Sequence, residues 1–227
     1  MASQVNPLEK WHKRAQTLTL GRRFLLFLLV CGVQMIYGPT SNRLTGGIEP
    51  KLPIDIFPIW AVWVVPYVLC YPLWLVGIAW AMFKMEDRLF RSFIVASLVM
   101  CSISMLIFIT FPTCVPAATF TATDIFTNML RYLHENAGRY DAFPSGHIYI
   151  TVLLTLFYNL WYPHYKFYWF VIPILVAFST LFTYQHYIVD IFGGWIVALI
   201  GFHIGLRWAG FAQSGSAVKR RVLEPPQ

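Results

Sequence analysis

The chain has 227 residues, of which 58% are hydrophobic, 18% aromatic and only 12% charged. This excess of apolar residues excludes an ordinary soluble domain, whose surface would lack the polar groups to cover so large a core, and it is typical of a membrane protein. The net charge is +7. Because the basic residues flank apolar segments, we expect a membrane and no nucleic acid as partner.

Residues 1–21 are polar and basic, and the apolar run behind them has no small-residue cleavage pattern. We therefore expect an interfacial segment on an anionic membrane surface rather than a secretory signal peptide. Residues 22–208 are expected to form the membrane domain. Residues 209–227 are small, polar and basic, and we expect them to form a mobile tail.

The membrane domain contains six apolar runs close to the roughly 20 residues that cross a bilayer. They predict an all-α bundle of six transmembrane helices, at about residues 22–38, 56–83, 92–111, 145–161, 167–184 and 187–208. Pro58, Pro66 and Pro72 predict that the second span is kinked or is entered through an interfacial turn.

The distribution of basic residues orients these spans. With the N-terminus inside, 13 of the 17 Lys and Arg residues fall on one side, and Arg43, Lys51, Arg131 and Arg139 fall on the other. This bias follows the positive-inside rule and predicts that both termini are cytoplasmic. The long connection between the third and fourth spans then lies outside, where apolar spacing within residues 125–133 predicts a short helix over the membrane face.

Several residue types in the spans are expected to serve packing alone. The four cysteines have neither metal-ligand nor disulfide spacing. The tryptophans are expected to mark interfaces and lipid contacts, and His134, like the histidines at 12, 164 and 203, is expected to be interfacial. The glycines near the C-terminus predict close helix contacts: Gly193, Gly194, Gly201 and Gly205.

The stretch PSGH, residues 144–147, opens the fourth span with polar residues. Ser145 is suited to cap a helix, and the helix behind it presents free amides and the positive end of its dipole to an anion. Gly146 lets a ligand approach the backbone, and His147 points toward whatever is bound. A nucleophilic role for Ser145 is disfavoured, because no base stands at a recognisable spacing and no G-x-S-x-G elbow is present.

A second polar group lies in TYQHYIVDIFGG, residues 183–194. On a helix, His186 and Asp190 would share one face about one turn, roughly 6 Å, apart. An aspartate can hold one imidazole nitrogen and leave the other as a nucleophile or base. The predicted topology brings this pair and His147 to the same membrane face, so we expect an anionic substrate that is reached from the bilayer.

The order of these motifs resembles the type 2 phosphatidic acid phosphatase superfamily, the lipid phosphate phosphatases and their transferase relatives. The resemblance implies that His186 is a nucleophile that forms a phosphohistidine, that Asp190 orients it, and that His147 protonates the departing alkoxide. It also implies hydrolysis of a lipid phosphomonoester or diphosphate at the extracytoplasmic or lumenal face, with no metal and no other cofactor.

The chain departs from the usual pattern of that family in two places. The segment FPTCVPAATF lacks the lysine and arginine of the first motif, and the pair Ser179-Thr180 lacks the arginine of the third. This pattern is similar to the branch that contains inositol phosphorylceramide synthases. Fewer cations leave less charge neutralisation for a phosphorane. Arg139 is the first candidate to replace these cations as a phosphate ligand, and Arg131 and Arg43 are the next candidates.

Three alternatives stay open. A phosphotransferase would move a phospho-headgroup from a lipid to an alcohol acceptor, in the manner of sphingolipid synthases. A non-catalytic carrier would capture an anionic lipid at the same helix N-terminus, although simple binding needs no oriented imidazole. The residues His147, His186 and Asp190 could also be ligands of a metal ion, which would need no anion-binding helix terminus.

Overall fold

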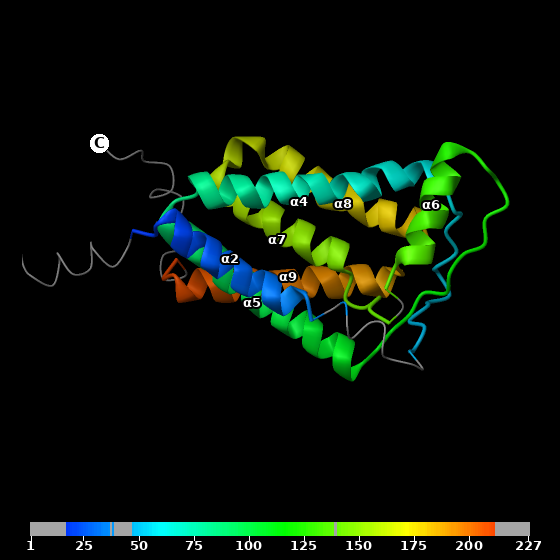
Figure 1. Cartoon of the computed structure of the whole chain (residues 1–227), viewed down its shortest axis with the longest axis horizontal. Coiled ribbons are helices and arrows are strands. Elements are labelled where there is room, and N and C mark those ends of the chain that lie inside the picture. Colours follow the sequence, from blue (N-terminus) through cyan, green and yellow to red (C-terminus); the bar gives the residue numbers. More distant parts are fainter. Residues whose placement is uncertain (1–16, 37, 39–46, 139, 212–227) are drawn as a thin grey trace, which may run out of the picture.

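The computed structural model describes residues 17–36, 38, 47–138 and 140–211. The helices are α2 (Leu20–Gln34), α4 (Val64–Lys84), α5 (Asp87–Thr110), α6 (Ile125–Asn136), α7 (Gly146–Trp161), α8 (Lys166–Phe182) and α9 (Ile188–Trp208), with the short 3-10 turns η1 (Ala61–Trp63) and η2 (Pro163–Tyr165). Within these ranges no strand forms, and only single bridges join Ile48 to Thr113 and Thr113 to Asp141. The all-α prediction is therefore confirmed (Figure 1).

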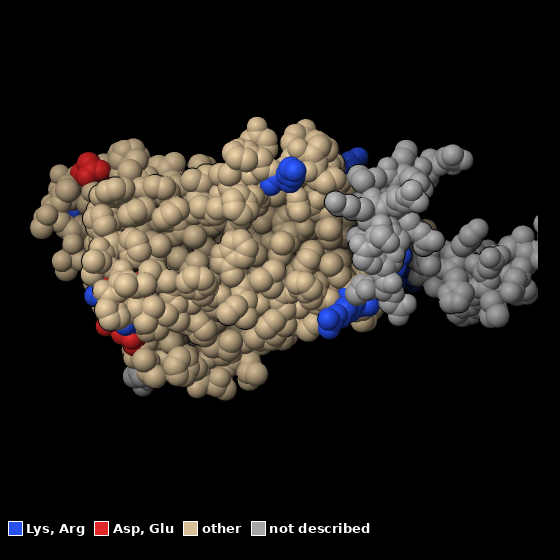
Figure 2. All heavy atoms as spheres, turned by 180° about the vertical axis from the view of Figure 1, so that it is seen from behind, with Lys and Arg blue, Asp and Glu red and all other residues tan. Residues whose placement is uncertain are grey.

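Four described helical segments are long and apolar enough to cross a membrane: Ala61–Lys84, Asp87–Thr110, Pro163–Phe182 and Ile188–Trp208. The chain is therefore a membrane protein. The helices α7 and α2 have 16 and 15 residues, and at about 1.5 Å per residue each is shorter than the roughly 30 Å hydrocarbon layer. The count of six spans stays a prediction. Figure 2 shows one face whose middle carries no Lys, Arg, Asp or Glu side chain.

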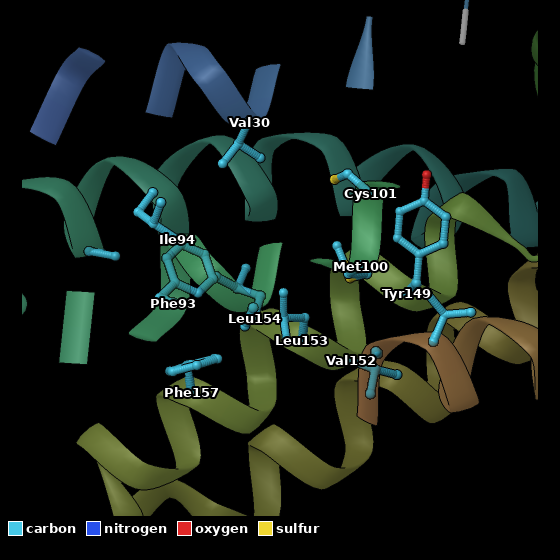
Figure 3. Close-up of a cluster of buried hydrophobic side chains, with 14 of the residues drawn as sticks. Val30, Phe93, Ile94, Met100, Cys101, Tyr149, Val152, Leu153, Leu154 and Phe157 are labelled. Atoms are coloured by element: carbon cyan, nitrogen blue, oxygen red, sulfur yellow. The ribbon is translucent and has the colours of Figure 1, made fainter. Parts of the chain in front are cut away.

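The core is formed where α5, α7 and α9 pack together, and α2 closes it through Val30. Figure 3 shows the rings of Phe93 and Phe157 within this cluster. The centroids of these two rings are 5.3 Å apart in an edge-to-face contact. Glycine allows α9 to lie directly against α5, since a Cβ added at Gly205 would stand 2.4 Å from the carbonyl oxygen of Ser92. The predicted close packing of the C-terminal glycines is thus confirmed.

The helix α5 begins at Asp87, several residues before the expected start of the third span. Glu86 causes this early start, because its carboxylate accepts the N–H groups of Arg88 and Leu89 at 2.9 and 3.0 Å. At the same end of the bundle, Asp87 accepts the N–H of Leu18, and the Arg88 side chain donates to the carbonyl of Ala209. The first and last described segments therefore meet at one end, and their cytoplasmic location stays a prediction.

The helix α6 lies where the short helix was expected, between α5 and α7, and its location outside the membrane stays a prediction. Asp124 caps it by accepting the N–H groups of Phe126 and Thr127 at 3.0 and 3.1 Å. In Figure 1 the helix runs across the ends of the long helices, opposite the end where the first and last described segments meet. Its exposed side chains include Ile125 and Tyr132, which fits the expectation of a helix lying against a membrane face.

Candidate active site

The turn between α8 and α9 places His186. The helix α8 ends in a Schellman motif, in which the N–H of Gln185 donates to Thr180 O and that of Tyr184 to Leu181 O, both at 3.0 Å. Tyr184 occupies the left-handed position with φ 56°, where glycine is usual and a tyrosine is strained by about 1–2 kcal/mol. The chain reverses here within a few residues. His186 therefore comes two residues after Tyr184, where it is buried just before the start of α9.

Two carboxylates hold the start of α9. The Oδ2 atom of Asp190 accepts the N–H of Tyr187 at 2.8 Å, and the Oδ1 atom of Asp55 accepts that of Ile188 at 3.0 Å. Both carboxylates are buried, and both satisfy amides that the helix itself leaves without a partner. Asp190 therefore has a structural role in addition to any chemistry.

The expectation that His186 and Asp190 share a helix face was wrong in one respect. His186 precedes the first residue of α9, and Asp190 lies in the first turn of that helix. The two still meet, because the Asp190 side chain folds back over the helix start, as residues in the first turn commonly do. The His186 Nδ1 atom lies 3.5 Å from Asp190 Oδ2. Such contacts are often long before substrate binds.

Ser145 occupies the position before the first residue of α7, as expected, but its side chain does not cap the helix. Its carbonyl accepts the N–H of Tyr149 at 3.0 Å, and its own N–H donates to the carbonyl of Asp190, also at 3.0 Å. The second bond joins the PSGH stretch to α9. Close contact is possible because a Cβ added at Gly194 would stand 2.9 Å from Ser145 O.

The structure brings the two histidines together. The ring centroids of His147 and His186 are 5.7 Å apart in an edge-to-face arrangement, although His147 lies in α7 and His186 in the turn between α8 and α9. Both rings and Gly146 line one cavity of about 1220 Å³ at the α6 end of the bundle. Arg139 and Arg43, two of the expected phosphate ligands, lie outside the described residues.

Thr113 positions the PSGH stretch, although it was not among the predicted site residues. It lies in FPTCVP, is fully buried, and accepts the N–H of Phe143 through its hydroxyl at 2.7 Å. Its carbonyl accepts the N–H of Ala142 at 3.1 Å. A threonine between two prolines in an apolar context was the available signal. The segment FPTCVP thus contacts the loop before PSGH through the hydroxyl and the carbonyl of Thr113.

The described wall of the cavity holds few cations. Arg131 is the one described arginine among its lining residues, and no described lysine lines it. The guanidinium of Arg131 is already engaged: it donates to Asn128 Oδ1 at 2.5 Å and to the carbonyl of Ala122 at 2.8 Å. Thr180, where the family arginine is expected, is fully buried and uses its carbonyl in the Schellman turn.

A third histidine also lines the cavity. His134 of α6, which was predicted to be interfacial, donates from Nε2 to the carbonyl of Thr183 at 2.8 Å. Burial lowers the pKa of His134 below its ordinary value, although the bond to Thr183 opposes that shift. His134 thus ties α6 to the turn that carries His186.

Four buried polar atoms gather around the two motifs without a hydrogen bond to any described residue: Ser145 Oγ, Gln185 Nε2, His186 Nδ1 and Asp190 Oδ1. Such atoms are rare in folded proteins, and each one costs about 1–3 kcal/mol. Their grouping at one place is typical of a site that is arranged for a ligand or a reaction. Among the residues that the structure describes, no three His, Cys, Asp or Glu side chains form a metal-ligand group.

Comparison with known proteins identifies the family of the chain. The family model described as the PAP2 superfamily matches residues 57–204, a range that includes both the PSGH stretch and the His186 to Asp190 pair. Searches among curated proteins and among solved structures gave no match. The match covers more than half of the chain and runs through α4 to α9, and it does not distinguish branches within the superfamily. The chain therefore belongs to the PAP2 superfamily.

Proposed function

We propose that this protein is a membrane phosphatase that hydrolyses a lipid phosphomonoester or diphosphate through a phosphohistidine on His186. Membership of the PAP2 superfamily supports a phosphatase-like activity on lipid phosphates. The observation that carries the proposal is the 5.7 Å separation of the His147 and His186 rings on the wall of one cavity. Two imidazoles at that separation can reach opposite sides of a single phosphoryl group.

In the proposed reaction, the phosphate binds at the start of α7, near the backbone of Gly146 and the positive end of the helix dipole. Ser145, expected as a phosphate ligand, is fully buried, does not line the cavity and donates its N–H to Asp190 O. Arg139 is proposed as a further phosphate ligand. The Nε2 atom of His186 attacks phosphorus, while Asp190 holds the Nδ1 side of the ring and stabilises the positive charge that develops. His147 gives a proton to the departing oxygen, and water then attacks the phosphohistidine. The scheme uses no metal ion.

The substrate is proposed to arrive from the bilayer and to react at the extracytoplasmic or lumenal face. The site lies at the end of the bundle opposite the meeting point of Leu18, Asp87 and Ala209. If the basic segments beside those residues are cytoplasmic, as the positive-inside rule predicts, the cavity faces outward.

Purified protein in detergent tests the proposal. We expect phosphate release from dioctanoyl phosphatidic acid in the presence of a chelator, and transfer of labelled phosphate to the protein in a rapid quench. His186→Ala should abolish both signals. His203→Ala is the matched control, because His203 is exposed on α9 and bonds only its own helix among described residues. Substantial phosphate release by His186→Ala would reject the nucleophile.

One observation favours the phosphotransferase as a second candidate. The cavity is large, at about 1220 Å³, and the described guanidinium on its wall is engaged by loop acceptors. A site with few free cations suits a phosphodiester, which carries less charge than a monoester. Movement of a labelled headgroup to an added alcohol would support transfer. Full-rate phosphate release in water without such movement would reject it.

A further inference from the structure

Three aromatic rings of α4 enclose the ring of His147. Tyr67, Tyr71 and Trp74 are spaced four and three residues apart, so they share one face of the helix. Their ring centroids lie 4.3, 5.7 and 5.6 Å from that of His147. The hydroxyl of Tyr71 lies 3.1 Å from His147 Nε2, within hydrogen-bond distance. The general acid of the proposed reaction thus has its own partner, as the nucleophile does.

The aromatic face is fixed against α7. The indole N–H of Trp74 donates to Thr151 Oγ1 at 2.9 Å, and that hydroxyl donates in turn to the carbonyl of His147 at 2.6 Å. Tyr67 is 4% exposed and packs closest to the imidazole. Because α4 and α7 are joined beside His147, the Tyr71 hydroxyl keeps its place relative to the imidazole.

We propose that Tyr71 is the positioning residue that prepares His147 as the general acid, an inference that rests on the proposed function. The Tyr71 oxygen accepts a hydrogen bond from Nε2–H of the imidazolium, and the Nδ1–H group is left to donate its proton to the departing oxygen. The aromatic faces add cation–π stabilisation of the charged ring. His186 faces a carboxylate, which favours positive charge on a nucleophile. His147 faces a neutral hydroxyl, which orients the ring but stabilises its protonated form less than a carboxylate would, so His147 gives up its proton more readily.

The proton balance follows from this pairing. As the bond from His186 Nε2 to phosphorus forms, the bond from phosphorus to the alcohol oxygen breaks, and that oxygen takes the Nδ1 proton of His147. The neutral His147 ring keeps the proton on Nε2, which stays hydrogen-bonded to the Tyr71 oxygen. The free Nδ1 can then accept a proton from the water that attacks the phosphohistidine, which restores the imidazolium.

Other groups can influence the charge of His147. Tyr67 and Tyr71 face it from α4, and His186, with Asp190 behind it, faces it from the α8 to α9 turn. The remaining titratable or charged side chains on the cavity wall are Cys114, Arg131, His134, Glu135, Tyr140, Asp141, Tyr149 and Tyr184. These groups remain unchanged in a Tyr71→Phe variant, so a comparison with the parent protein isolates the hydroxyl.

The test compares two substrates in one protein preparation. Dioctanoyl phosphatidic acid has an alkoxide leaving group that needs a proton, whereas the nitrophenolate of p-nitrophenyl phosphate leaves without one. In Tyr71→Phe we expect kcat for the lipid to fall about tenfold and kcat for the aryl phosphate to change less than about twofold. The alkaline limb of the lipid pH profile should move about one pH unit lower, because the imidazolium loses its acceptor.

The ratio of the two rates does not depend on the fraction of folded protein, so partial misfolding of the variant does not blur the result. Tyr168→Phe, an exposed tyrosine of α8, is the control and should keep both rates. Equal loss on both substrates with an unchanged pH profile would overturn the role of Tyr71. If the parent protein releases phosphate from neither substrate, the proposed function fails, and this inference fails with it.

Discussion

Neutralising Asp190 tests how the nucleophile is supported. In Asp190→Asn the amide oxygen can still accept the N–H of Tyr187, which the carboxylate accepts at 2.8 Å, so the start of α9 should persist. What disappears is the negative charge 3.5 Å from His186 Nδ1. At an effective dielectric constant of about 20, a full charge pair at that separation is worth about 5 kcal/mol.

That interaction grows as His186 becomes positive during attack, so it acts on the transition state more than on substrate binding. Since about 1.4 kcal/mol corresponds to a factor of ten, and only part of the charge develops, we expect kcat to fall about 10³-fold. The KM should change less than about threefold. Initial rates of phosphate release from dioctanoyl phosphatidic acid, with a thermal melt of each preparation, measure both quantities.

Asp55→Asn provides the matched control. Asp55 is a second buried carboxylate at the same helix start, where it accepts the N–H groups of Ile188 and Leu52 at 3.0 and 2.7 Å. We expect the control to lower the melting temperature and to reduce kcat by less than about tenfold. A kcat loss below tenfold in folded Asp190→Asn, or equal losses in both variants, would refute electrostatic support of His186.

Other substitutions probe the scaffold of the site. Thr113→Val removes the hydroxyl that accepts the N–H of Phe143 at 2.7 Å; a buried amide without a partner costs about 1–3 kcal/mol, and activity should fall at least tenfold. Gly194→Ala should lower activity and the melting temperature, because the new methyl would stand 2.9 Å from Ser145 O. Burial lowers the pKa of His134. The contribution of neutral His134 to the free energy of unfolding is therefore fully present above about pH 6.5 and is lost as pH falls through the lowered pKa. Thermal melts across that range measure the loss.

Each of these predictions has a control within the chain. Thr113→Ser keeps the hydroxyl and should retain most activity, whereas equal loss in the serine and valine variants would contradict a hydrogen-bonding role. Gly32→Ala lies where an added Cβ meets nothing within 4 Å, so both properties should stay unchanged. His134→Gln removes the titrating ring, and its melting temperature should therefore depend less on acid pH than that of the parent. An equal acid dependence in both proteins would place the titration elsewhere.

The sequence by itself determined the features that depend only on residues close together in the chain. Apolar runs fixed the helical class and the approximate helix bounds, because the hydrophobic length of a segment needs no knowledge of its neighbours. The four-residue spacing of His186 and Asp190 predicted their contact through a shared helix face, whereas the contact forms with His186 just before α9, because the Asp190 side chain folds back over the helix start. Glycine spacing predicted that this segment packs closely against other helices, and the structure shows that its partner at Gly201 and Gly205 is α5.

Tertiary structure decided what depends on residues far apart in the chain. The 5.7 Å approach of His147 to His186 and the hydrogen bond from the Phe143 N–H to the Thr113 hydroxyl depend on how the helices and the loop pack. The aromatic partners of His147 come from α4, more than 70 residues earlier, and their spacing alone could equally mark a lipid-facing stripe. Composition reports how apolar a segment is, whereas the partner of each side chain is set by the rotation and depth of helices in the packed bundle.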